Sequence, residues 1–202
     1  MNALRDATLQ GAFLGRTEDI LTDKNGSEKA KNTKDLVRKF AIDLTGQNVV
    51  VNDDYVYTLI NNVVKSAPSS IDKKGNVVNF TYGNAQKLIN MTAKYLYIRN
   101  YSNPQLTASF KNCHCPLDNQ IVKKLKSDVK RGSDLDKSIK ELYSAVNNSE
   151  QTKTWRQYLD LPWSSCTKER YQFFQKAIRK IIEKKYNNEI TPLEYDYIMW
   201  NS

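Results

Sequence analysis

The chain has 202 residues, of which 40% are hydrophobic, and it carries a formal net charge of +9 at pH 7. This length and composition predict a globular fold with a substantial core and exclude an intrinsically disordered tail. No segment approaches the roughly 20 consecutive apolar residues of a membrane-spanning helix, and the N-terminus lacks the apolar centre of a secretory signal. We therefore expect a soluble, cytoplasmic protein with no membrane contact.

The excess positive charge lies in one quarter of the chain. Residues 81–132 contain 9 Lys or Arg against 2 Asp or Glu, a balance of +7. The balance is +1 for residues 1–52 (8 against 7), zero for 53–80 (3 against 3) and +1 for 133–202 (11 against 10). A uniformly basic surface would mainly affect solubility, whereas this concentration predicts an anionic partner.

Apolar residues recur at helical spacing through most of the first half. The pattern predicts four helices, at residues 3–22, 27–46, 53–66 and 81–100. The last is the strongest, because its apolar stripe repeats every three or four residues: Ala85, Leu88, Ile89, Thr92, Tyr95 and Leu96. Gln86, Asn90 and Lys94 form a polar row on another side of that helix, and a loop is expected to follow it.

The loop at residues 66–75, with Pro68 and Gly75, is the best internal boundary. Strand signals are scarce. The β-branched runs at residues 48–52 and 76–82 predict at most one short strand pair.

The second half predicts five further segments, at residues 116–129, from 133 onward, at 154–163 (a short aromatic helix or turn), at 167–186 and at 191–200. Ser133 and Thr191 are expected to cap their helices, with Asp136 and Glu194 completing capping boxes. The whole pattern predicts an all-α protein, a single domain of seven or eight helices over residues 1–202. Residues 1–66 are a candidate N-terminal helical subdomain packed on a helical core of residues 76–202.

The stretch FKNCHCPLDNQIVKKLK, residues 110–126, holds the chain's one histidine, His114, between Cys113 and Cys115. No metal site is predicted, because three consecutive side chains rarely converge on one ion and no C-x-x-C pair is present. The odd number of cysteines, three in all, predicts reduced thiols without a disulfide framework.

Helix-start chemistry explains the next part of this stretch. Pro116 is expected at the first helical position, where its missing N–H is harmless, and Asp118 at the third, beside the positive end of the helix dipole. His114 has no such explanation. In an enzyme acting on a phosphorylated substrate, His114 would be the general acid or base and Asp118 its partner. No P-loop, Ser-His-Asp spacing or H-E-x-x-H motif accompanies them, so we expect a binding protein without a cofactor rather than an enzyme.

The lysines that follow suggest anion binding. Lys123, Lys126 and Lys130 are expected to share one side of the predicted helix, and packing against the helix at 81–100 would unite the basic residues of both. The candidate anion-binding residues are Gln86, Lys87, Asn90, Lys94, Arg99, Lys123, Lys124, Lys126, Lys130 and Arg131. Their target would be nucleic acid or a nucleotide. A solvated lysine-rich face remains the alternative.

Four stretches, YGNAQKLINMTAKYLYI, CHCPLDNQIV, YQFFQKAIRK and TPLEYDYIMW, resemble a group of small helical bacterial and phage-associated proteins. The shared pattern comprises A-Q-K-x-x-N-M-x-x-K-Y-L and H-x-P-x-D motifs, an aromatic-Gln helix and a closing P-L-E helix. The matching positions are Ala85, Gln86, Lys87, Asn90, Met91, Lys94, Tyr95, Leu96, His114, Pro116, Asp118, Gln175 and Glu194. The resemblance covers about the last 120 residues. It implies a helical fold, one polar cluster between two helices and a setting of phage–host conflict, but no particular reaction.

The sequence therefore supports three hypotheses for the function. The leading hypothesis is a basic helical protein that binds nucleic acid or a nucleotide. The second is the His114-dependent enzyme. The third is a protein–protein adaptor or inhibitor that uses the aromatic C-terminal helices.

Overall fold

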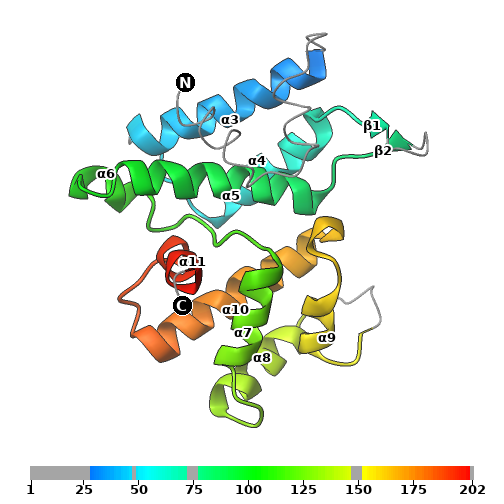
Figure 1. Cartoon of the computed structure of the whole chain (residues 1–202), viewed down its shortest axis with the longest axis vertical. Coiled ribbons are helices and arrows are strands. Elements are labelled where there is room, and N and C mark those ends of the chain that lie inside the picture. Colours follow the sequence, from blue (N-terminus) through cyan, green and yellow to red (C-terminus); the bar gives the residue numbers. More distant parts are fainter. Residues whose placement is uncertain (1–27, 47–48, 72–76, 147–151, 201–202) are drawn as a thin grey trace. The chain divides into compact units, whose positions relative to one another are not determined.

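The computed structural model describes residues 28–46, 49–71, 77–146 and 152–200, and the all-α class is confirmed (Figure 1). Nine α-helices, one short 3-10 helix and one two-stranded pair lie in these ranges. The extra helix relative to expectation is α6, described below. The helix predicted at residues 3–22 lies outside the described residues.

Backbone contacts divide the chain into two compact units, residues 1–113 and 114–202. Each unit is described by itself. The loop at residues 66–75, which the sequence marks as the best internal boundary, lies inside the first unit.

The first unit is built on three mutually packed helices, α3 (Glu28–Gly46), α4 (Asp53–Ser66) and α5 (Tyr82–Arg99). Their apolar faces supply the core, which includes Val37, Phe40, Leu44, Val56, Ile60, Val63, Leu88 and Ile89. Asn52 caps α4 and Thr81 caps α5, each accepting a hydrogen bond from a first-turn N–H. The bounds of these helices agree with the sequence patterns.

Helix α6 (Pro104–Ser109) occupies a segment that the sequence analysis predicted to be a loop. Asn103 accepts hydrogen bonds from the N–H groups of Gln105 and Leu106, and Pro104 takes the first helical position. This Asn-Pro start signal was overlooked because the helix is too short to show apolar periodicity. Ser109 Oγ donates to the carbonyl oxygen of Leu44 at 2.6 Å and so ties α6 to α3.

One short antiparallel pair joins β1 (Ser70–Ile71) to β2 (Val77–Val78). It uses part of the predicted run at residues 76–82. The described part of the other run, residues 49–52, forms no strand.

The second unit is organised around α10 (Lys168–Tyr186), which packs against α8 (Asp134–Ser144), α9 (Trp155–Asp160) and α11 (Pro192–Trp200). Helix α7 (Asn119–Asp128) packs against α9 and α11, and a 3-10 helix, η1, spans Trp163–Ser165. The core of α10 is continuous and aromatic at its N-terminal half: Tyr171, Phe173, Phe174, Ala177, Ile178, Ile181 and Ile182.

The start of α7 corrects one prediction. Asp118 is the N-terminal cap rather than the third helical residue, and its Oδ1 accepts hydrogen bonds from the N–H groups of Gln120 and Ile121 at 2.9 and 3.0 Å. Pro116 therefore precedes the helix. A capping carboxylate satisfies two first-turn donors at once, which Asp118 could not do from the third position.

Both predicted capping boxes form the bond from a first-turn N–H to the capping hydroxyl, but only one of them forms the reciprocal bond back to the N–H of the capping residue. At α11, Thr191 Oγ1 accepts from Glu194 N–H, and Glu194 accepts from Thr191 N–H at 2.7 Å, so the box is complete. At α8, Ser133 caps as predicted, but the carboxylate of Asp136 reaches Gly132 N–H instead. Asp136 is thereby tied to the turn that precedes its helix.

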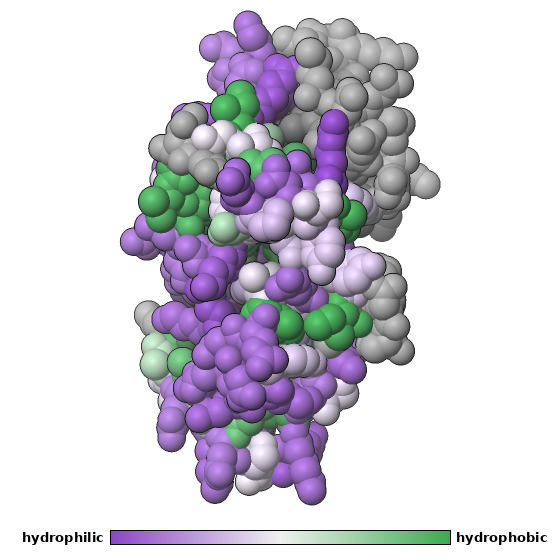
Figure 2. All heavy atoms as spheres, turned by 90° about the vertical axis from the view of Figure 1, so that its left-hand side faces the viewer, coloured by the Kyte–Doolittle hydropathy of each residue, from purple (hydrophilic) through white to green (hydrophobic). Residues whose placement is uncertain are grey.

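Hydrophilic side chains dominate the lower end of the space-filling view in Figure 2, the end at which α7 and α8 meet in Figure 1. Among the described helices, none combines the length and apolar character needed to cross a membrane.

Candidate functional site

The predicted polar residues of the first unit are largely internal. Gln86, Lys87 and Asn90 are buried, and Asn90 Nδ2 donates to Gln86 Oε1 at 3.1 Å. Lys94 is half-buried and Arg99 is exposed. These five belong to the first unit, whereas His114 and Asp118 belong to the second. The single cluster expected between two helices thus stays a prediction.

His114 is fully buried within the second unit. Its Nδ1 lies 3.0 Å from the hydroxyl oxygen of Tyr171, and the two rings contact each other with centroids 5.6 Å apart. This contact with α10 supplies the structural explanation that the sequence did not reveal. A general acid or base must reach a substrate, so full burial weighs against the catalytic role.

Gln175, one turn further along α10, holds the backbone beside His114. Its Oε1 accepts from Cys115 N–H at 3.1 Å, and its Nε2 donates to the Cys115 carbonyl oxygen at 2.7 Å. Buried main-chain groups outside regular structure need such partners. The chain before α7 is therefore fixed to α10 by a two-point amide contact.

The cysteines are small core residues. Cys113, Cys115 and Cys166 are all buried and carry free thiols. Within the part of the chain that the structure describes, no three His, Cys, Asp or Glu side chains form a group that could hold a metal ion.

Helix α7 has one buried and one exposed side. Ile121, Val122 and Leu125 are buried. The side chains that face solvent are polar or basic and include no acid: Asn119, Gln120, Lys123 and Ser127. The free face, as we call these four residues, carries the uncompensated ammonium group of Lys123, which has no ion-pair partner among the described residues.

The other two lysines of α7 are already paired. Lys126 forms an ion pair with Asp160, and Lys124 lies 4.0 Å from Asp128. Asp128 also accepts from Lys185 and from the Tyr195 hydroxyl, each at 2.9 Å. Lys124 and Lys126 therefore contribute less to an external anion site than their positions in the sequence suggest.

Lys130 and Arg131 do not continue the helix, which corrects the predicted alignment of Lys123, Lys126 and Lys130. The last helical residue of α7 is Asp128, and Val129 is its C-terminal cap. Lys130 and Arg131 are exposed in the turn that leads to α8, and no acid pairs with them in the described ranges. Gly132 follows with φ of 78°, a left-handed conformation that favours glycine.

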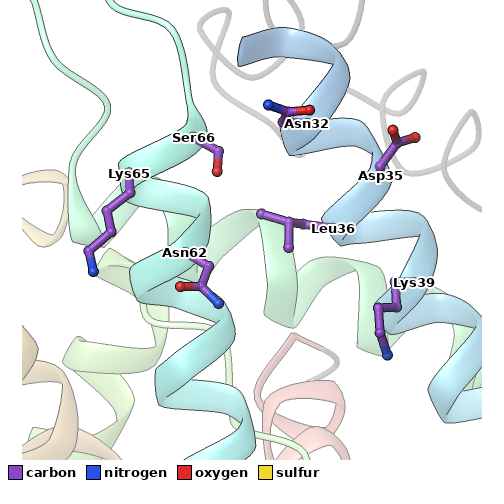
Figure 3. Close-up of a pocket in the computed structure, with 7 residues that line it drawn as sticks. All are labelled: Asn32, Asp35, Leu36, Lys39, Asn62, Lys65 and Ser66. Carbon is purple, nitrogen blue, oxygen red and sulfur yellow. The ribbon is translucent and has the colours of Figure 1, made fainter. Parts of the chain in front are cut away.

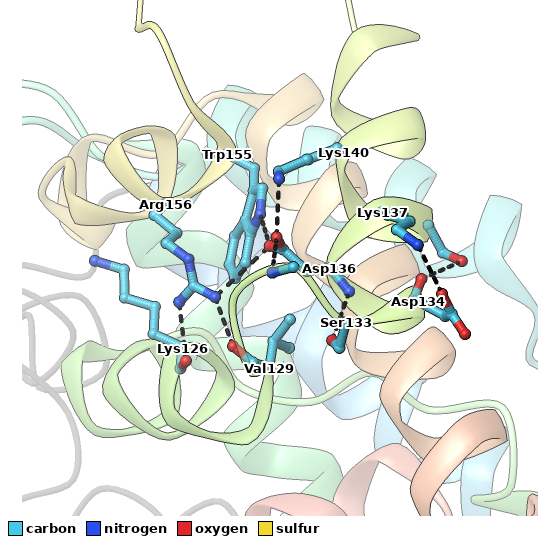
Figure 4. Close-up of polar contacts among 11 residues, drawn as sticks. Lys126, Val129, Ser133, Asp134, Asp136, Lys137, Lys140, Trp155 and Arg156 are labelled. Atoms are coloured by element: carbon cyan, nitrogen blue, oxygen red, sulfur yellow. Dashed lines mark hydrogen bonds and ion pairs between the residues drawn. The ribbon is translucent and has the colours of Figure 1, made fainter.

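The buried carboxylate of Asp136 is hydrogen-bonded to this turn (Figure 4). It accepts hydrogen bonds from Gly132 N–H at 3.0 Å and from Trp155 Nε1–H at 3.0 Å, and it forms an ion pair with Lys140 at 2.9 Å. Burial raises the pKa of Asp136, but the bonds from Gly132, Lys140 and Trp155 outweigh burial and lower that pKa to about 2. The carboxylate is therefore charged at neutral pH.

Arg156 binds backbone carbonyl groups at the C-terminal end of α7. Its guanidinium donates to the carbonyl oxygens of Lys126 at 2.9 Å and Val129 at 2.5 Å, and it lies 3.7 Å from Asp136. Cations at a helix C-terminus satisfy its last carbonyls and oppose its dipole. Burial lowers the pKa of Arg156, Asp136 raises it, and the neighbouring positive charge of Arg131 lowers it again. The turn thus brings the positive charges of Arg131 and Arg156 close together.

The sequence did not predict the contacts of Asp136 that hold this turn. The residues Arg131, Gly132 and Ser133 signal a helix-to-helix turn, but two of the partners of Asp136, Trp155 and Arg156, lie about 20 residues further on. Only the fold brings these side chains together.

A separate pocket of about 500 Å³ lies between α3 and α4 in the first unit (Figure 3). Its lining residues are Asn32, Asp35, Leu36, Lys39, Asn62, Lys65 and Ser66. Asp35 pairs with Arg38 and Lys39 pairs with Asp43, both within α3. None of the predicted site residues lines this pocket.

The aromatic residues of the C-terminal helices are mainly core residues. Trp155, Tyr158, Tyr171 and Tyr195 are buried, whereas Tyr197 is exposed. The adaptor hypothesis, which needs these side chains at the surface, gains no support from their positions.

Comparison of the chain with models of known families, with curated proteins and with solved structures finds no match. The resemblance to the phage-associated group therefore stays an expectation drawn from sequence motifs.

Proposed function

We propose that this protein binds nucleic acid through an exposed cation cluster of its second unit. The cluster consists of Lys123, Lys130 and Arg131. The observation that carries the proposal is that these three side chains are exposed and lack an acidic partner in the described part of the chain. The neighbouring exposed acids, Asp134 and Asp160, are matched by other lysines.

An extended polyanion suits this geometry better than a nucleotide. The three cations lie on a helix face and on the turn that follows it, and a nucleotide is normally enclosed in a pocket. A phosphate backbone can instead contact cations spread along a surface. Each neutralised phosphate releases condensed counterions, so binding through three cations should weaken with salt at a logarithmic slope of roughly −3.

The triple variant Lys123→Glu/Lys130→Glu/Arg131→Glu tests this proposal in the full chain, with a short random-sequence DNA duplex as the probe. Binding should fall by about a hundredfold or more at low salt, because three attractions become repulsions. The matched control, Lys29→Glu/Lys31→Glu/Lys34→Glu on α3, has the same charge change and should lose much less. The proposal fails if wild-type binding is absent or insensitive to salt, or if both triple variants lose affinity equally.

A further inference from the structure

The free face of α7 carries more than charge. Asn119 and Gln120 contribute carboxamides, Ser127 a hydroxyl and Lys123 an ammonium group. Successive helical residues are rotated by 100°, so these four side chains span an arc of about 100° on one side of α7. This arc presents both donors and acceptors and includes neither an acid nor an aromatic ring.

We propose that α7 enters the major groove of a B-form DNA duplex and contacts base edges through Asn119 and Gln120, while Lys123 contacts the phosphate backbone. This inference rests on the proposed function, and it adds sequence-dependent recognition to backbone binding. Asn and Gln pair with the N6 and N7 edge of adenine. Base-edge contacts of this kind specify sequence, whereas phosphate contacts only position the protein.

The dimensions and the order of residues fit this placement. Helix α7 has 10 residues, which gives a length of about 15 Å, and a helix of roughly 10–12 Å diameter fits a groove about 12 Å wide. The carboxamides lie in its first turn, the part of a recognition helix that commonly contacts bases. Lys130 and Arg131 follow its last turn, where they can reach phosphates beside the groove.

The first turn of α7 is held firmly enough for base readout. Asp118 accepts from the N–H groups of Gln120 and Ile121, and Gln175 fixes the preceding backbone at Cys115. Side chains that start from a fixed backbone lose less freedom on binding. The two carboxamides therefore project from a preorganised turn.

The chemistry of the free face favours duplex DNA over other nucleic acids. The major groove of A-form RNA is deep and narrow, so side chains cannot read it. Single strands are recognised mainly by stacking on aromatic rings, and the free face has none. Hydrogen-bonding side chains on a convex helix match an open groove instead.

Selection from a random duplex pool with the full chain, followed by affinity measurement, tests the inference. Wild-type protein should prefer the selected duplex over a scrambled duplex by about tenfold or more, as expected for one or two base contacts. Asn119→Ala/Gln120→Ala should bind both duplexes with the wild-type affinity for the scrambled one. The control Asn32→Ala/Asn62→Ala, which removes two exposed carboxamides from α3 and α4, should keep the preference.

The outcomes separate the inference from the proposed function. Salt-dependent duplex binding without any preferred sequence overturns base readout and leaves backbone binding intact. A preference that survives Asn119→Ala/Gln120→Ala also overturns it. If wild-type protein binds no duplex at all, both proposals fail.

Discussion

The two ends of helix α7 are held by similar contacts but face different surroundings. Residues 114–118, which precede the helix, are all buried, whereas Lys130, Arg131 and Gly132, which follow it, are exposed. A buried polar side chain fixes each end: Gln175 at the start and Asp136 at the finish.

This difference separates structural residues from residues available to a partner. The single histidine and its flanking cysteines attract attention by their rarity, yet they lie in the core. The lysines are common in the chain and thus uninformative individually, but the two cations that follow α7, Lys130 and Arg131, have no acidic partner among the described residues. Accessibility, rather than rarity, therefore decides which of the two segments that flank α7 can contact an anion.

The largest expected effect on stability concerns the buried segment that precedes α7, residues 114–118. Gln175→Ala removes both hydrogen bonds to the Cys115 backbone and leaves a cavity beside α10, which should lower the free energy of unfolding by about 3–5 kcal/mol. Urea denaturation of the full chain measures this loss. Lys176→Ala, an exposed neighbour on the same helix, should change the stability by less than about 0.5 kcal/mol. Equal losses for the two variants would contradict a structural role for the Gln175 amide.

The next largest effect on stability concerns Asp136, which holds the exposed turn that follows α7. Asp136→Asn weakens the bonds from Gly132, Trp155 and Lys140, and should lower the free energy of unfolding by about 2–3 kcal/mol. Asp134→Asn is a matched control, because Asp134 lies two residues away in the same helical turn but is 97% exposed against 2% for Asp136. Its effect on unfolding should stay below about 0.5 kcal/mol. A destabilisation of similar size in both variants would show that burial of Asp136 does not matter.

The smallest expected effect is the loss of the stability contributed by Asp136 at acid pH. The pKa of Asp136 is lowered from 3.8 to about 2 in the folded state, so its contribution is fully present above about pH 5 and is lost as pH falls toward 2. Linkage gives this contribution as about 2 kcal/mol. The difference in unfolding free energy between wild type and Asp136→Asn should therefore shrink over this pH range. A constant difference down to pH 2 would contradict the lowered pKa.

Local sequence signals predicted most of the helices because periodicity and capping depend on neighbouring residues. The bounds of α5 and the complete capping box at Thr191 and Glu194 follow from such signals. Helix α6 was not predicted, because its six residues are too few to show a periodic apolar stripe.

The candidate site was predictable only in part, because its geometry depends on distant residues. Lys123, Lys130 and Arg131 were identified by charge, but the pairing of Lys126 with Asp160 depends on a contact across 34 residues. The contacts of His114 with Tyr171 and of Cys115 with Gln175 span about 60 residues. No local pattern predicts such contacts, so the burial of His114 and the pairing of Lys124 and Lys126 could not be foreseen from the sequence.

The most direct test of the account is a backbone amide NMR titration of the isotope-labelled full chain with a short DNA duplex. We predict that the signals of Lys123, Lys130 and Gly132 shift on binding, and that the signals of His114 and Cys115 remain nearly unchanged. Shifts concentrated at residues 114–118, with Lys123 and the turn after α7 unaffected, would contradict the assignment of anion binding to Lys123, Lys130 and Arg131.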